Sequence, residues 1–180
     1  MLYVICGIIA GLVVAIDQVS KYFAEASNVN VVIIPELLKF KLAWNDGAAF
    51  SMLGDASWAQ TFFKIITIII LLGIIFLMVY CIVKKKNVSK WLAVAVALVF
   101  GGAVGNLIDR FAFNRVRDFM YLFYNTDIFP AIFNVADIGL VVGVIMICIY
   151  LLFLDKDAIL KRKPKTINES EQVEEITDGN

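Results

Sequence analysis

Long apolar stretches alternate with shorter polar segments along the 180-residue chain. Four of these stretches approach the roughly 20 residues that a helix needs to cross a bilayer, approximately residues 2–24, 62–83, 91–108 and 132–154. The pattern therefore predicts an all-α integral membrane protein with four transmembrane helices. Residues 1–165 are expected to form a single membrane domain, followed by an acidic, disordered cytoplasmic tail over residues 166–180.

The polar segment between the first two apolar runs contains a second kind of pattern. Its stretch "VNVVIIPELLKFKLAWNDGAAFS" is rich in Val, Ile, Phe and Trp, and it alternates partially around "LKFKLAW". Such residues in such an order are typical of strands. We therefore expect a small extracytoplasmic β element at the membrane surface.

Basic residues next to the apolar runs predict the orientation of the chain. Two short segments, "KKKNVSK" and "KDAILKRKPK", follow the second and fourth runs, and the positive-inside rule puts both in the cytoplasm. Both termini are then cytoplasmic, and residues 25–61 and 109–131 face outward. Three arginines in the second outer segment oppose this rule, Arg110, Arg115 and Arg117. The first run has no preceding lysine or arginine and no small-residue cleavage site, so we expect a retained helix and not a signal peptide.

The composition limits the chemistry. The chain is 61% hydrophobic and only 18% charged, which supports an integral membrane protein. It contains no histidine, which excludes Ser-His and Cys-His catalysis and HExxH zinc sites. Its three cysteines lie in apolar runs, so neither a disulfide nor a metal site is expected. There is no basic patch with interleaved aromatic residues, so no nucleic-acid partner is expected.

Polar side chains gather where the apolar runs meet the outer side. Asp17 and Lys21 fall one turn apart on one face of the first helix. The other three predicted helices carry polar residues near their outer ends: Lys64, Asn106, Asp109, Arg110, Asn134 and Asp137. We therefore expect polar groups from all four helices to converge at one level. Ion pairs that only hold the bundle together, Asp17 with Lys21 and Asp109 with Arg110, are the alternative to direct chemistry.

Two carboxylates suggest more than structural pairing. Asp118 lies in the short polar stretch "RVRDFM", and Asp137 begins the fourth helix, where an acidic residue is also favoured by the helix dipole. Two carboxylates close together in a water-excluding site share one proton, because their charges repel. Acid-base hydrolysis of an amide needs such a pair. A further carboxylate, Asp127, is assigned to a loop.

Five motifs, in their order along the chain, resemble those of lipoprotein signal peptidases, the type II signal peptidases of bacteria. The motifs are "DQVSK" (Asp17 to Lys21), "NDGAAFS" (Asn45 to Ser51), "GGAVGNLIDR" (Gly101 to Arg110), "VRDF" (Val116 to Phe119) and "FNVAD" (Phe133 to Asp137). Each motif alone is weak. Together they form a specific signature that covers all of the chain except the acidic tail.

The resemblance implies a membrane aspartic endopeptidase without a metal or other cofactor, with a small sheet in the first outer segment and a short helix in the second. Its substrate would be a prolipoprotein with a diacylglyceryl-modified lipobox cysteine, cut N-terminal to that cysteine near the outer leaflet of the bacterial cytoplasmic membrane. Membrane lipid would be its other partner, and the enzyme would be monomeric. By motif, the catalytic pair is Asp118 and Asp137, and the residues that support the site or contact substrate are Asp17, Lys21, Asn45, Gly47, Asn106, Asp109, Arg110, Asn134 and Ala136.

The chain departs from the family pattern at two positions. Asp137 is followed by Ile138 and Gly139, where the family usually has a small hydroxyl residue. Arg117 precedes Asp118, where an aliphatic residue is more usual. A cation at this position is expected to lower the pKa of Asp118 and to favour its ionised, water-activating form.

Two other functions are compatible with a small polytopic protein. A transporter or channel subunit would use Asp17, Asp109 and Asp137 to line an ion path, but it predicts polar residues at several depths. The inner halves of the second and third runs carry no charge. A membrane scaffold would use "GGAVG" as an association face, but this function leaves Asp118 and the asparagines unexplained.

Overall fold

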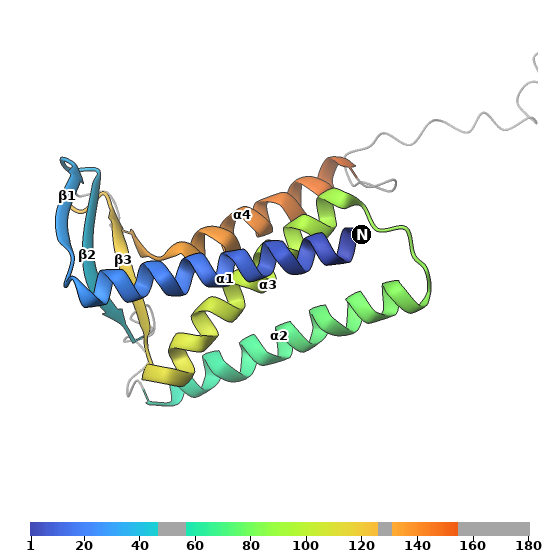
Figure 1. Cartoon of the computed structure of the whole chain (residues 1–180), viewed down its shortest axis with the longest axis horizontal. Helices are drawn as coiled ribbons and strands as arrows, with labels where there is room; N and C mark the ends of the chain where they lie inside the picture. Colours follow the sequence, from blue (N-terminus) through green and yellow to red (C-terminus); the bar gives the residue numbers. More distant parts are fainter. Residues whose placement is uncertain (47–56, 126–130, 155–180) are drawn as a thin grey trace, which may run out of the picture. The chain divides into compact units, whose positions relative to one another are not determined.

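A computed structural model of the chain describes residues 1–46, 57–125 and 131–154, and all structural statements below concern these residues. The chain divides into two compact units, Met1–Cys148 and Ile149–Asn180. The first contains the helices and the sheet, drawn in Figure 1. In the second, the described residues end in a π-helix, η2 (Tyr150–Leu154). Gly47, Asp127 and the acidic tail lie outside the described residues.

Four long helices confirm the predicted spans. They are α1 (Leu2–Ala26), α2 (Ser57–Val83), α3 (Lys90–Phe113) and α4 (Val135–Ile149). Each of the first three is long and apolar enough to cross a membrane, as is α4 together with η2. The boundaries differ most at the start of α2, which begins at Ser57, and at the end of α3, which continues to Phe113 and then stops at Asn114. Asn114 adopts a left-handed conformation with φ of 56°, which asparagine tolerates better than most residues and which commonly ends a helix.

Small residues let neighbouring helices approach α3 closely. In the apolar window of α3, 44% of the residues are buried, against 11% in α1 and 6% in α2. A Cβ atom on Gly101 would lie 2.8 Å from the backbone oxygen of Ala10 in α1, and one on Gly102 would overlap the backbone oxygen of Ala136 in α4. This is the packing typical of membrane helices, where small residues replace the hydrophobic effect as the basis of close contact.

A four-stranded antiparallel sheet completes the first unit, in the order β1-β2-β3-β4. Its strands are β1 (Asn30–Ile34), β2 (Leu38–Asn45), β3 (Val116–Leu122) and β4 (Ala131–Phe133). Strands in the first outer segment are confirmed. The described part of the second outer segment contains no separate short helix: it continues α3 to Phe113 and then forms β3 and the start of β4. The sequence "VRDFMYL" explains the difference, because β-branched and aromatic residues favour strands.

The register of the sheet brings distant polar residues together. Ala43 of β2 pairs with Asp118 of β3, so Asn45, two residues along β2, lies on the same face as Asp118. Phe133, the last residue of β4, pairs with Met120 of β3. Because α4 begins two residues later, its first turn starts beside the strand that carries Asp118.

We predict that Gly102→Ala destabilises the protein by about 1–3 kcal/mol, because the added methyl group forces α3 and α4 apart. Gly73→Ala is the matched control, since a Cβ atom there meets nothing within 4 Å. Thermal unfolding in detergent measures both. Equal midpoints for the two variants would show that the close approach of α3 and α4 contributes no stability.

Candidate active site

Asp118 is a buried carboxylate held by two asparagine side chains. It is 1% exposed. Asn45 Nδ2 donates a hydrogen bond to its Oδ2 at 2.8 Å, and Asn134 Nδ2 donates one to its Oδ1 at 2.6 Å. Burial raises the pKa of the Asp118 carboxyl from its ordinary 3.8 to about 6, the two amide hydrogen bonds oppose this rise, and the nearby charge of Asp137 adds to it.

Asp137 is held by the first turn of its own helix and by α3. The backbone N–H of Asn134 donates to Asp137 Oδ2 at 3.1 Å, and the backbone N–H of Asp137 donates to Asn134 Oδ1 at 3.0 Å. This reciprocal arrangement is that of a capping box, which stabilises the start of a helix. Asn106 Nδ2 donates to the remaining oxygen, Oδ1, at 2.7 Å. Asn134 therefore contacts both Asp118 and Asp137 and fixes them beside one another.

A buried lysine orients the amide groups. Lys21 is fully buried, and its Nζ lies 2.8 Å from Asp17 Oδ2 and donates to Asn106 Oδ1 at 3.0 Å. The predicted ion pair of Asp17 with Lys21 is thus present. Because the Asn106 oxygen accepts from Lys21 and from Asn134 Nδ2, the Asn106 amide nitrogen is directed at Asp137. The other Asp17 oxygen accepts the backbone N–H of Ala136 at 2.9 Å, which ties α1 to the first turn of α4.

The expected pairing of Asp109 with Arg110 is wrong. Asp109 forms ion pairs with Arg117 Nη2 at 2.8 Å and with Lys21 at 3.6 Å. Arg110 instead stacks over the ring of Phe63 in α2, with 5.2 Å between the guanidinium carbon and the ring centroid. The physical reason is helix geometry, because consecutive residues point about 100° apart and do not face one another.

The expected effect of Arg117 on Asp118 is also wrong. Adjacent residues of a strand point to opposite faces, so the guanidinium of Arg117 turns away from Asp118 toward Asp109 and Glu25. The pKa of Asp118 is raised and not lowered. Burial lowers the pKa of Arg117, but the hydrogen bonds and charges of Asp109 and Glu25 outweigh burial and raise it, so this arginine stays charged.

Most of the predicted site residues lie in one hydrogen-bonded network. The exceptions are Arg110, whose side chain has no hydrogen bond to the network among the described residues, and Gly47, which lies outside them. Among the described residues, Lys64 of α2 donates to Asn114 at the end of α3 and not to this network, so the helices that contribute to the network are α1, α3 and α4. The prediction missed Gln18 and Glu25, which bind Arg117. Their spacing to Lys21, three and four residues, places all three on one face of α1 and could have indicated them.

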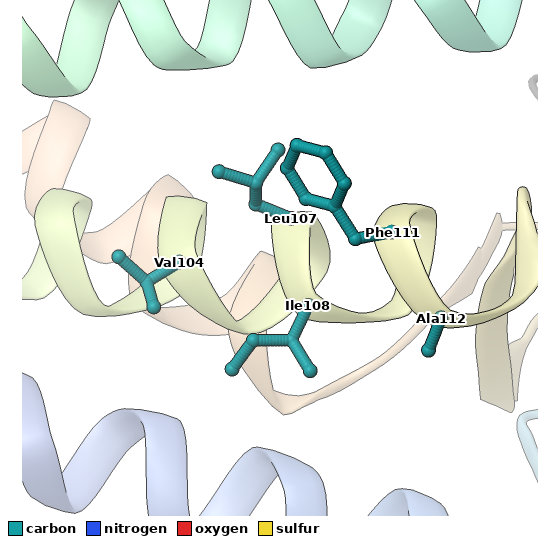
Figure 2. A pocket seen from close by; sticks show the side chains of 5 residues that line it. All are labelled: Val104, Leu107, Ile108, Phe111 and Ala112. Atoms are coloured by element: carbon teal, nitrogen blue, oxygen red, sulfur yellow. The ribbon is translucent and has the colours of Figure 1, made fainter.

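An apolar pocket of about 470 Å³ lies elsewhere on α3. Its lining side chains all project from this helix, as Figure 2 shows: Val104, Leu107, Ile108, Phe111 and Ala112. At 100° per residue these positions form a stripe opposite to Asn106 and Asp109. The pocket is therefore separate from the carboxylates. Within residues 1–46, 57–125 and 131–154, no group of three or more His, Cys, Asp or Glu side chains could hold a metal ion.

The site thus contains a buried carboxylate, Asp118, and a half-buried one, Asp137, which are joined through one asparagine and supplied with amide donors. Such a pair suits the acid-base chemistry of an aspartic peptidase. Comparison with known proteins agrees with this class. The family model for signal peptidase II matches residues 9–153. The chain therefore belongs to the signal peptidase II family.

Individual relatives and solved structures are similar over most of the chain. The lipoprotein signal peptidase of Pseudomonas paraeruginosa is 43% identical over 143 residues, which are 77% of this chain and 82% of that protein. The lipoprotein signal peptidase of Pseudomonas aeruginosa is 41% identical over the same shares. A bacterial membrane enzyme solved by the in meso method at 1.9 Å resolution has 39% identity and a TM-score of 0.69, covering 82% of this chain and 92% of that chain.

The raised pKa of Asp118 predicts a pH dependence of stability. The folded state binds the proton more tightly than the unfolded state, so stability is full below pH 4 and falls as the pH rises to about 6. The loss attributable to Asp118 is about 3 kcal/mol. Thermal midpoints measured from pH 4 to 7 should therefore fall more steeply for wild type than for Asp118→Asn. Parallel curves would contradict the raised pKa.

Proposed function

We propose that this chain is a bacterial membrane aspartic endopeptidase that removes the signal peptide from prolipoproteins, with Asp118 and Asp137 as its catalytic residues. The observation that carries the proposal is the contact of Asn134 with both carboxylates. A buried and a half-buried carboxylate fixed to one residue, with no ion pair to either of them among the described residues, favour a single shared proton. The names of the relatives support prolipoproteins as the substrates.

The shared proton supplies both steps of amide hydrolysis. The ionised carboxylate takes a proton from water, whose oxygen attacks the scissile carbonyl carbon, while the protonated carboxyl donates its proton to the carbonyl oxygen. In the second step the tetrahedral intermediate collapses. One carboxyl protonates the leaving amine and the other recovers the hydroxyl proton, so the pair ends with one proton, as it began.

The remaining network residues position this pair. Lys21 and Asp17 direct Asn106 and the start of α4, and Asn45 holds Asp118. Arg110 Nε is buried and has no hydrogen-bond partner among the described residues, so it is a donor available to a substrate carbonyl. By its motif, Gly47 also contacts the substrate.

The substrate is the diacylglyceryl-modified form, cut N-terminal to the lipidated cysteine. A lipid-anchored substrate reaches the enzyme within the bilayer, so its cleavage site lies near the interface, which is where polar groups of the spans are stable. The exposed lysines that follow α2 support a cytoplasmic position for the α2–α3 connection. The site is then near the outer leaflet, both termini are cytoplasmic, and the enzyme acts as a monomer surrounded by lipid.

We predict that Asp118→Asn and Asp137→Asn each lower turnover of a diacylglyceryl-modified prolipoprotein at least a thousandfold, because each removes one half of the acid-base pair. Cleavage by purified enzyme, followed by gel shift or mass spectrometry, measures the loss. EDTA should leave the wild-type rate unchanged. Folding of each variant is checked by thermal unfolding.

Asp127→Asn is the matched control, since it neutralises a carboxylate between the two catalytic positions in sequence, and its turnover should stay within twofold of wild type. Retained cleavage in either catalytic variant would return that aspartate to a structural role. A folded wild type that cuts no prolipoprotein would overturn the proposal as a whole.

A further inference from the structure

Arg117 joins three elements of the fold through one side chain. Its Nε and Nη2 donate to the two oxygens of Asp109 in α3, at 3.2 and 2.8 Å. Its Nη1 donates to Glu25 at 3.0 Å, and Nη2 also donates to Gln18 at 3.1 Å, both in α1. The side chain is only 7% exposed, and its guanidinium also stacks over Phe113 at 4.7 Å. Few side chains other than arginine offer enough fixed donors for such an arrangement.

These contacts hold one face of β3, and the proposed catalytic carboxylate lies on the other face. Arg117 and Asp118 are neighbours in a strand, so any shift or rotation of β3 that loosens Arg117 also moves Asp118 relative to Asn45 and Asn134. The hydrogen bonds from these asparagines, at 2.8 and 2.6 Å, leave little room for such movement. A displacement of about 1 Å is enough to cost a catalytic site much of its rate.

We propose that Arg117 is a positioning residue, which clamps β3 to α1 and α3 through Asp109, Gln18 and Glu25 and thereby fixes the place of Asp118. This inference rests on the proposed role of Asp118 in catalysis. Arg117 acts through geometry and not through its charge on Asp118, because its guanidinium faces the opposite side of the strand. Glu25 belongs to the clamp as the outermost partner, with 38% of its side chain exposed.

The guanidinium contacts of Arg117 are distinct from the contact that its backbone makes with Asp109. The backbone N–H of Arg117 also donates to Asp109 Oδ2, at 2.9 Å, and this bond survives any change of side chain. Asp109 additionally keeps Lys21 at 3.6 Å and Gln18 at 3.2 Å. Loss of the guanidinium therefore leaves Asp109 paired, and it removes mainly the connection from β3 to α1.

The test compares Arg117→Val, Arg117→Lys and Glu25→Gln with the matched control Arg115→Val, in full-length protein in lipid nanodiscs. Arg115 is an exposed arginine two residues away, which stacks over Trp44 at 4.0 Å. We expect Arg117→Val to lower kcat about tenfold, with KM within twofold of wild type. The kcat of Arg117→Lys should lie between those of wild type and Arg117→Val. Glu25→Gln should lower kcat two- to threefold alone and add nothing in the double variant with Arg117→Val. Arg115→Val should stay within twofold.

Hydrogen exchange of the β3 backbone amides gives a second measurement that does not need turnover. We expect it to rise at least fivefold in Arg117→Val and to stay unchanged in Arg115→Val. A folded Arg117→Val with wild-type kcat or wild-type exchange would overturn the inference. If Arg117→Val does not fold, Arg117→Lys and Glu25→Gln decide, and wild-type kcat in both overturns it. Wild-type protein that cleaves nothing would overturn the proposed function alone, and the exchange measurement would still decide the role of Arg117.

Discussion

Burial of carboxylates is the constraint on which the rest of this structure depends. Asp17 and Asp109 are fully buried and Asp118 nearly so, and an uncompensated buried charge costs several kcal/mol. Two cations, Lys21 and Arg117, balance Asp17 and Asp109. Asp118 and Asp137 receive amide donors in place of cations. The distribution of charge thus separates a supporting cluster held by ion pairs from two carboxylates that have no ion pair among the described residues.

Close helix packing is what allows these charges to meet. A Cβ atom on Gly105 would lie 2.7 Å from Asp17 Oδ2. The α1 carboxylate therefore occupies space that the side chain of any other residue type at position 105 would fill. Gly101 and Gly102 likewise bring α1 and α4 close to α3. The glycines that allow close helix packing therefore also set the position of the polar network. The same residues serve both roles, so the amino-acid composition does not distinguish one role from the other.

The sequence predicted the features that depend on local pattern. Apolar run length located the four spans, alternation located β1 and β2, and the i,i+4 spacing identified the pair of Asp17 with Lys21. The five motifs identified the family. The motifs also identified most residues of the network, but several individual partners in distant segments were not predicted correctly. Arg117, which pairs with Asp109, is eight residues away in another element, and the chain reaches it through the left-handed residue Asn114. The clamp of Arg117 similarly needs α1, α3 and β3 in place.

The i,i+4 spacing of Asp17 and Lys21 has a consequence for how the chain is inserted into a bilayer. Asp17 and Lys21 form an ion pair one turn apart on the same helix, so the two charges of α1 neutralise each other. Helix α1 can therefore enter the lipid before any later segment is synthesised. Asp109 has no such partner within α3. Its first cation, Lys21, is already present on α1, and its second, Arg117, emerges only after α3 is complete. The order of synthesis therefore gives Asp17 and Asp109 one cation, Lys21, that is made no later than their own helices.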